Sequence, residues 1–256
     1  MRAAEGAPRP GPPGPFRRAP PARYYAGCVS QAPAPPARDA ADRPGLFLTF
    51  EGGDGVGKTT QTRILAEALR AEGVEVLVTR EPGGTDLGAE IRRLLLDGGH
   101  VDPRAEALLY AADRAHHVAT LVRPALERGA VVVSDRYLDS SVAYQGAARS
   151  LGAEDVRSLS LWATGGLLPD RTILLDADPA LADRRTGGRG GRDRLERESD
   201  AFRAALREQF LALADAEPER IVVIDAARPV EAVTAAVRSA LDPLLDARSG
   251  PGGRDA

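Results

Sequence analysis

The sequence predicts an α/β fold in which helices cover both faces of a five-stranded parallel sheet, and two observations support it. Short apolar runs, rich in β-branched residues, occur at Leu46–Phe50, Val74–Thr79, Ala130–Ser134, Thr172–Asp176 and Ile221–Asp225. Segments of helical period separate them, at Thr60–Ala71, Ala105–Leu126, Ala201–Ala214 and Val230–Leu245. Apolar strands alternating with helices are typical of a parallel sheet that is buried on both faces. We therefore expect one three-layer domain over residues 45–248.

The composition limits what this domain is made of and what it binds. The 256 residues are 43% hydrophobic but only 4% aromatic, so the core has to be mainly aliphatic. The formal net charge of −3 argues against a general nucleic-acid binder, which usually has a basic domain. Any affinity for phosphate must therefore come from local clusters of basic residues.

Two further features bear on location. Cys28 is the single cysteine, which excludes an intramolecular disulfide and fits a reducing compartment. No apolar run approaches the roughly 20 residues that a membrane span requires. We expect a soluble, cytoplasmic protein without a membrane partner.

The two ends of the chain differ from the rest. Ten of the 20 prolines precede Pro44, and residues 1–44 show little aliphatic periodicity. We therefore expect this segment to be a disordered extension. An Arg-rich organelle targeting segment and a misassigned start codon are alternative interpretations. The tail over residues 249–256 is polar and Gly-rich, and we expect it to be flexible.

A phosphate-binding loop follows the first predicted strand. Residues Gly52–Thr59 match the pattern G-x-x-x-x-G-K-[ST] in full, and a predicted helix follows. The glycines let backbone N–H groups face an anion, and the helix N-terminus adds positive potential. Lys58 is the only lysine among the 34 basic residues, and its ammonium is a compact charge that suits the outer phosphates. The pattern predicts a nucleoside triphosphate site and a P-loop NTPase fold.

A metal position goes with this loop. The Thr59 hydroxyl follows the lysine, where it can bind Mg²⁺. Asp135 ends the third predicted strand and can hold the same ion directly or through water. A purely structural carboxylate is the alternative for Asp135.

The remaining sequence narrows the reaction class. A signalling GTPase requires an Asn-Lys-x-Asp motif, which cannot exist in a chain whose only lysine is Lys58. P-loop motors and helicases are usually larger. The sequence therefore favours a kinase for a small acceptor.

Four further motifs identify a family. They are Arg80-Glu81-Pro82-Gly83-Gly84-Thr85, Leu108-Leu109-Tyr110-Ala111-Ala112-Asp113-Arg114, Asp135-Arg136-Tyr137 and Ser140-Ser141-Val142-Ala143-Tyr144-Gln145-Gly146. In combination they resemble the thymidylate kinase family, and the resemblance extends over about residues 46–245. It implies transfer of the γ-phosphoryl group of ATP to dTMP, with Mg²⁺, in a homodimer. A kinase for another deoxynucleoside monophosphate and a non-catalytic nucleotide-binding protein remain the alternatives.

Several acceptor residues can be argued from their positions. Arg136 follows a parallel strand at the edge where α/β sheets bind ligands, so it can grip the acceptor phosphate through two parallel hydrogen bonds. A surface salt bridge is the alternative. Tyr110 and Arg114 share one helix face, where a ring can stack on a base and a guanidinium can donate to its edge. An isolated aromatic at this spacing is more often a core residue, and the family usually has phenylalanine in place of Tyr110.

The resemblance supplies the other assignments. It implies that Asp54 serves catalysis near the acceptor's sugar and phosphate, that Ser141 and Tyr144 contact sugar and base, and that Tyr144 crowds a ribose 2′-hydroxyl. It also places Glu81 in the acceptor site. Arg92, on the helix after the Gly-Gly-Thr turn, is a further candidate for the acceptor phosphate. The predicted dTMP-binding set is Asp54, Glu81, Arg92, Tyr110, Arg114, Arg136, Ser141 and Tyr144. The predicted ATP-binding set is Gly52, Gly53, Asp54, Gly55, Val56, Gly57, Lys58, Thr59, Thr60 and Arg185, with Lys58, Asp54, Arg136 and Arg189 predicted as catalytic.

A lid is expected over residues about 184–198, which are rich in arginine and glycine. The variable positions of the phosphate-binding loop contain no arginine, so the resemblance implies a catalytic arginine in the lid. Arg189 is the first candidate and Arg192 the second, while Arg185 is expected to flank the adenine. A solvated loop without a catalytic role is the alternative.

The remaining unusual residues suggest no chemistry. His100, His116 and His117 lack the spacing of a shared metal face, so we expect structural roles. We expect Trp162 to lie in the core or at an interface.

Overall fold

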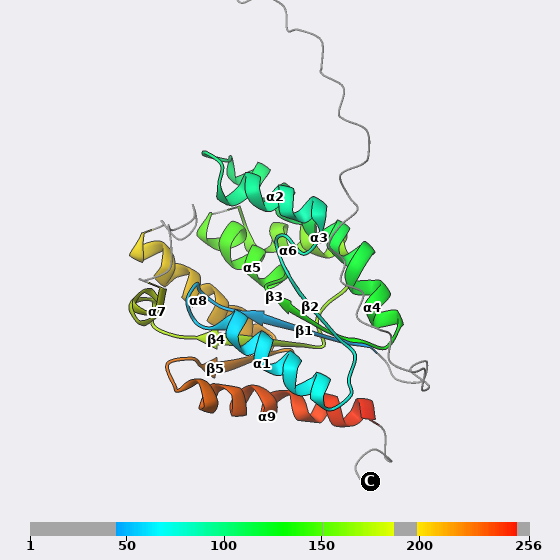
Figure 1. The fold of residues 1–256 in the computed structure, drawn as a ribbon. Coiled ribbons are helices and arrows are strands. Elements are labelled where there is room, and N and C mark those ends of the chain that lie inside the picture. The colour runs from blue at the N-terminus through cyan, green and yellow to red at the C-terminus, as the bar shows by residue number, and fades with distance from the viewer. Residues whose placement is uncertain (1–44, 150, 187–198, 250–256) are drawn as a thin grey trace, which may run out of the picture. The chain divides into compact units, whose positions relative to one another are not determined.

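The computed structural model describes residues 45–149, 151–186 and 199–249 (Figure 1). The strands form one parallel sheet in the order β2-β3-β1-β4-β5. They are β1 (Leu46–Glu51), β2 (Val76–Arg80), β3 (Val131–Asp135), β4 (Arg171–Asp176) and β5 (Ile221–Asp225). Each overlaps the range predicted from the sequence, and the predicted five-stranded parallel sheet is confirmed.

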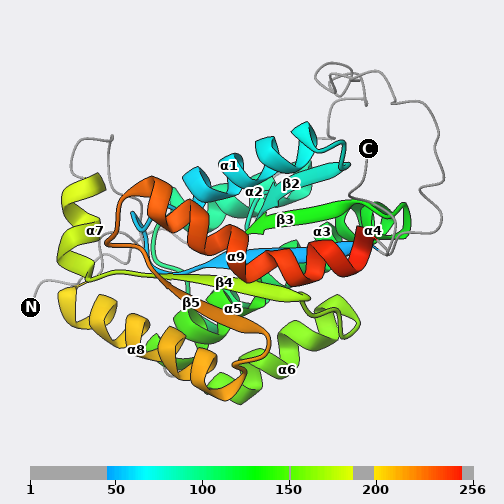
Figure 2. The same cartoon turned by 90° about the horizontal axis from the view of Figure 1, so that it is seen from below.

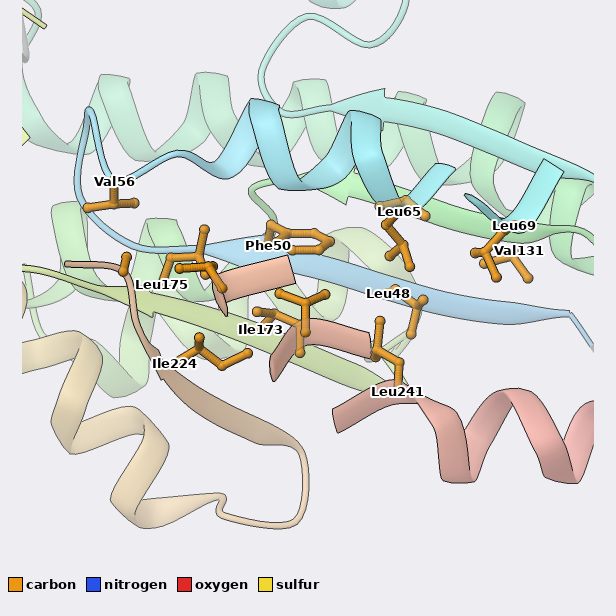
Figure 3. Close-up of a cluster of buried hydrophobic side chains, with 14 of the residues drawn as sticks. Leu48, Phe50, Val56, Leu65, Leu69, Val131, Ile173, Leu175, Ile224 and Leu241 are labelled. Carbon is orange, nitrogen blue, oxygen red and sulfur yellow. The ribbon is translucent and has the colours of Figure 1, made fainter. Parts of the chain in front are cut away.

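Two helices cover one face of this sheet. They are α1 (Lys58–Ala71) and α9 (Val230–Ser249), which lie side by side (Figure 2). Their aliphatic side chains interdigitate with alternate residues of the strands (Figure 3). Leu48 and Ile173 from the sheet meet Leu65 and Leu241 from the helices, as a strand buried on both faces requires.

The other face carries the remaining elements that position the site. They are α3 (Pro103–His117), η2 (Val118–Val122), α4 (Arg123–Glu127), α5 (Leu138–Ser141), η3 (Val142–Ala148) and α8 (Asp200–Ala216). Outside them, α2 (Asp86–Leu96) and α6 (Ala153–Thr164) both pack on α3, and α7 (Pro179–Thr186) follows β4. The predicted three-layer arrangement is confirmed.

The helix predicted over Ala105–Leu126 is not uniform. It consists of α3, the π-helical η2 and α4 in succession. Pro124 lies in the first turn of α4 and has no N–H to donate to the preceding turn. A widened turn before the proline accommodates this loss, so the prediction of one regular helix was wrong at this point.

The ends of three neighbouring strands bring the motifs together. In the register of the sheet, Phe50 of β1 and Arg80 of β2 both lie beside Asp135 of β3. The segments that leave these strands therefore meet at one edge of the sheet. This is where ligands bind in open α/β folds.

Some predictions fall outside the described residues: the extension over 1–44, the tail over 250–256 and the lid over 187–198. Within the described ranges, no helix combines the length and apolar character that a membrane span needs. Trp162 on α6 is 82% exposed, so the expectation of a core position for it was wrong. The alternative of an interface position stays a prediction.

Candidate active site

The phosphate-binding loop connects β1 to α1 through three glycines whose backbone conformation L side chains rarely adopt. Gly52, Gly55 and Gly57 all have positive φ, and Gly57 is the N-cap of α1. A Cβ at Gly52 would lie 2.3 Å from the carbonyl oxygen of Leu175. The turn that aims the loop at a phosphate therefore depends on the absence of side chains.

Lys58 lies at the start of α1 with its ammonium folded back over the loop. Its Nζ donates to the carbonyl oxygens of Gly52 (3.1 Å) and Gly53 (2.6 Å). Burial and the nearby charge of Arg136 lower the pKa of Lys58 to about 8. A bound anion would supply the countercharge that this buried ammonium needs.

All nine predicted triphosphate-binding positions from Gly52 to Thr60 line one cleft. Its volume of about 1740 Å³ exceeds the range of roughly 300–1,000 Å³ that is usual for one small ligand. The cleft is therefore large enough for a nucleoside triphosphate.

The two predicted metal ligands lie together. The Thr59 hydroxyl donates to Oδ2 of Asp135 over 2.7 Å. Within the described part of the chain, no cluster of three or more His, Cys, Asp or Glu side chains offers another metal site. A hydroxyl and one carboxylate fit Mg²⁺, which usually keeps several waters and binds substrate phosphates with only one or two protein ligands.

Arg136, Asp54 and Tyr144 form a second group, called here the acceptor mouth. The Arg136 guanidinium donates to Oδ1 of Asp54 and, over 3.3 Å, to the Tyr144 hydroxyl. That hydroxyl donates to the other Asp54 oxygen over 3.2 Å. The Arg136 guanidinium also lies 5.3 Å from the centre of the Tyr144 ring. The mouth thus ties the phosphate-binding loop to the turn after β3.

Charges at the mouth are strongly perturbed. Partial burial opposes the charged form of Asp54, but the charges of Arg136 and Lys58 outweigh it and hold the pKa of this carboxyl below its usual value. Burial raises the pKa of Tyr144 well above its usual value, so this hydroxyl stays neutral. Arg136 pairs directly with the Asp54 carboxylate, while the carboxylates of Glu51 and Asp135 act on it from further away.

Glu81, Arg114, His117 and Ser141 form a third group, called here the acceptor floor. Arg114 is 1% exposed and donates from Nε to Oε2 of Glu81 over 2.7 Å. Its Nη2 donates to the Ser141 hydroxyl (2.9 Å) and to the Tyr137 carbonyl (3.2 Å). Its Nη1 donates to the Ser160 hydroxyl over 3.0 Å, which leaves one of the five guanidinium hydrogens for a ligand.

The second oxygen of Glu81 is also engaged. His117 Nδ1 lies 2.8 Å from Oε1 of Glu81, and His117 Nε2 lies 2.7 Å from the Thr79 hydroxyl. Glu81 therefore stands behind Arg114 and orients it. The fully buried His117 has the structural role that the sequence predicted.

The Asp113 carboxyl, at the edge of the floor, has a hydrogen-bond partner for only one of its two oxygens. Oδ1 of Asp113 accepts the N–H of Gly83 over 3.3 Å, while Oδ2 is buried without a hydrogen-bond partner. Burial and repulsion from Glu81 raise the pKa of Asp113 to about 6. Asp113 holds the turn between β2 and α2, and Arg92 reaches the site from α2.

All eight predicted acceptor residues line one small cavity between floor and mouth. Arg92 donates to the carbonyl of Pro82 over 3.0 Å. Tyr110 is 9% exposed and packs against Ile91, Leu95 and Leu96 while it lines the cavity. It is therefore a core residue as well, and its stacking on a base stays a prediction.

Sequence reasoning missed several contributors. The cavity is also lined by Pro82, Leu96, Tyr137, Ser140 and Gln145. All of these except Leu96 lie inside the motifs quoted above, so the motifs contained the signal. Glu51 was missed as well, although it is the one charged residue of the otherwise largely apolar strand β1.

Among the predicted site residues, only those of the lid lie outside the part of the chain that the structure describes. Arg189 and Arg192 lie within 187–198, and the side chain of Arg185 at the end of α7 is also outside the described set. The structure brings together the rest of the predicted site.

Comparisons with known proteins agree with this geometry. A family profile described as thymidylate kinase matches residues 50–237. A thymidylate kinase of Leifsonia xyli subsp. xyli is 64% identical over 203 residues, which cover 78% of this chain and 96% of the relative. Thymidylate kinases of Bifidobacterium longum (strain NCC 2705) and Deinococcus radiodurans are 60% and 50% identical, over 78% and 77% of this chain and 98% and 96% of theirs. This chain belongs to the thymidylate kinase family.

Proposed function

We propose that this protein phosphorylates dTMP to dTDP with ATP as the phosphoryl donor and Mg²⁺ as the metal ion. The observation that carries the proposal is the convergence of floor and mouth on one cavity beside the phosphate-binding loop. Membership of the thymidylate kinase family and the names of the relatives support the same activity.

The chemistry requires positioning and charge more than bond-making groups. The loop N–H groups and Lys58 hold the outer phosphates of ATP, while Arg136 holds the acceptor phosphate. An oxygen of that phosphate attacks the γ-phosphorus in line, and the bond to the β–γ bridging oxygen breaks. No general base is needed because the acceptor is already anionic. Thr59 and Asp135 would hold Mg²⁺, which neutralises charge on the β- and γ-phosphates when bound.

The floor supplies recognition of the base. Tyr110 can stack on the pyrimidine, and the remaining hydrogen of Arg114 can be donated to an oxygen at its edge. Tyr144 lies at the mouth, where its ring would crowd a ribose 2′-hydroxyl and so favour a deoxynucleotide.

A lid arginine completes the proposed site. The loop of this chain has no arginine among Gly53, Asp54, Gly55 and Val56, so the arginine that stabilises the transferred group has to come from another segment. We assign this role to Arg189, with Arg192 as the second candidate and Arg185 beside the adenine. Such an arginine contributes roughly 10³–10⁵ in rate in related P-loop systems.

Release of ADP tests the activity directly. Purified protein is given ATP, Mg²⁺ and, in parallel reactions, dTMP, dUMP or dCMP, and ADP is measured by a coupled assay. We expect turnover with dTMP to exceed turnover with the other two. Preference for another monophosphate would replace the proposed acceptor, and ATP binding without turnover would favour a non-catalytic nucleotide-binding protein.

A homodimer is the assembly that we propose, from the family resemblance and from the surface. Leu94 (48%), Leu108 (59%) and Trp162 (82%) are exposed apolar side chains on α2, α3 and α6, which pack one against the next. Trp162→Asp should shift the protein from dimer to monomer in analytical ultracentrifugation. An unchanged sedimentation coefficient would exclude this face. The cytoplasmic location stays a prediction.

A further inference from the structure

Glu51 is a buried carboxylate that no substrate can reach. It is the last residue of β1, directly before the phosphate-binding loop, and it is 0% exposed. It lines neither the cleft nor the cavity described above. Burying a carboxylate is costly unless its oxygens are hydrogen-bonded, so its partners indicate its role.

The partners of Glu51 all come from the segment that follows Arg136. Oε1 of Glu51 accepts the backbone N–H groups of Tyr137 (2.7 Å) and Ser140 (3.3 Å). Oε2 accepts the Ser140 hydroxyl over 2.6 Å. All three donors are neutral groups, so Glu51 acts here as a hydrogen-bond acceptor and not as half of an ion pair.

The backbone of Arg136 explains why this segment has to be held. Its φ of 71° makes it the one non-glycine residue with positive φ in the described ranges. The left-handed conformation is unfavourable for an L-residue, and such residues persist where their surroundings fix them. The N–H of Arg136 donates to the carbonyl oxygen of Phe50 over 2.9 Å. The carbonyl oxygen of Arg136 accepts the Ser134 hydroxyl over 2.8 Å. Glu51 holds the N–H of the next residue and so completes the turn.

The side chain of Arg136 depends on the same anchor. Its Nη1 donates to the Ser140 hydroxyl oxygen over 3.0 Å and to the Gly52 carbonyl over 2.9 Å. The Ser140 hydroxyl therefore donates to Glu51 and accepts from Arg136. Glu51 thus fixes Arg136 from two directions, through the backbone and through this serine.

The charges near Glu51 indicate that it can accept these hydrogen bonds without carrying a negative charge. Asp139 on α5 is paired with Arg220 through two hydrogen bonds of 2.7 and 2.8 Å. Burial and repulsion from Asp139 raise the pKa of Glu51 to about 7, although Arg136 opposes the shift. A neutral amide oxygen should therefore still accept the two backbone N–H groups, although the amide NH2 cannot accept the Ser140 hydroxyl.

We propose that Glu51 is a positioning residue for acceptor phosphate binding, because it anchors the turn that aims Arg136 across the mouth. The proposal rests on the proposed function.

Steady-state kinetics with both substrates test this role. Glu51→Ala should raise the KM for dTMP about tenfold, while the KM for ATP changes by less than about twofold. Glu51→Gln should stay within about threefold of the wild type, because its amide oxygen still accepts both N–H groups. As a matched control we choose Asp170→Ala, since Asp170 accepts the N–H of Phe47 (2.7 Å) at the opposite end of β1. This control should leave the KM for dTMP unchanged.

The same variants in an Arg136→Ala background show whether Glu51 acts through Arg136. The effect of Glu51→Ala on kcat/KM for dTMP should then disappear. Additive effects, or an equal rise in both KM values, would overturn the proposal. If Glu51→Ala does not fold, Ser140→Ala takes its place: it should raise the KM for dTMP about threefold, again only when Arg136 is present. A wild type without dTMP turnover would instead refute the proposed function, so the two failures are distinguishable.

Discussion

The two arginines of the acceptor site are supported in different ways. Arg114 in the floor bonds directly to Glu81, and both side chains are 2% exposed. Arg136 in the mouth reaches its buried carboxylate, Glu51, only through Ser140, and its direct partner Asp54 has a side chain that is 41% exposed. The first arginine is fixed inside the protein, whereas the second has a partner that an incoming anion can replace.

This difference suggests how one cavity combines recognition with exchange. Donors that are oriented before the ligand arrives need no rearrangement, which suits the recognition of a base edge that we propose for Arg114. A phosphate resembles a carboxylate in presenting paired oxygens to a guanidinium, so it can take the place of Asp54 on Arg136.

Removal of the floor carboxylate should have the largest effect. Glu81→Ala leaves the buried Arg114 without its countercharge and His117 without an acceptor. Breaking a buried pair in this way costs about 3–5 kcal/mol of the free energy of unfolding. Urea denaturation followed by circular dichroism measures it. A loss below about 1 kcal/mol would show that the floor is not fixed by this pair.

The second prediction concerns pH and the carboxylate behind the mouth. The pKa of Glu51 is raised from 4.5 to about 7, so between these values the folded protein binds a proton that the unfolded chain releases. The free energy of unfolding therefore falls as pH rises through this window.

Glu51→Gln lacks this titration. Its stability should thus increase relative to the wild type between pH 5 and pH 8, as measured by urea denaturation across that range. Parallel pH profiles for the two proteins would contradict the assignment of the raised pKa to Glu51.

The mouth should affect binding more than stability. Arg136→Ala removes charged hydrogen bonds to the acceptor phosphate, each of which contributes about 1.5–3 kcal/mol, so the KM for dTMP should rise about 10- to 100-fold. The KM for ATP should change little. Initial-rate kinetics with each substrate varied in turn give both values, and unchanged dTMP kinetics would remove Arg136 from the acceptor site.

An exposed ion pair on α1 should give the smallest loss of stability among these variants. Arg63 and Glu67 lie four residues apart on α1, with side chains 62% and 58% exposed. Arg63→Ala should cost only about 0.3–0.5 kcal/mol of stability because solvent already screens the pair. A loss as large as that of Glu81→Ala would mean that burial does not explain the difference.

The sequence was sufficient for features that depend on local spacing. The phosphate-binding loop and the strand positions follow from residues that are close in the chain, so Gly52, Lys58 and Thr59 lie where the motif predicted. Motif resemblance extended this to the eight residues of the acceptor cavity.

Contacts between distant residues were beyond sequence reasoning. The partners of Glu51 lie 86 and 89 residues further along the chain, and only the register of β1 beside β3 brings them together. Likewise, a charged residue at 81 gives no sign that its oxygens will be used by Arg114 and His117 rather than by a ligand. Pairing across the fold decides which carboxylates face a substrate and which orient the groups that do.

Calorimetric binding of thymidine and dTMP to the wild type and to Arg136→Ala most directly tests the division between floor and mouth. Thymidine has the base and sugar but no phosphate, so it depends on the floor. We predict that Arg136→Ala lowers the affinity for dTMP to about that for thymidine and leaves thymidine binding unchanged. An equal loss of affinity for both ligands would show that floor and mouth act as one unit and would contradict this account.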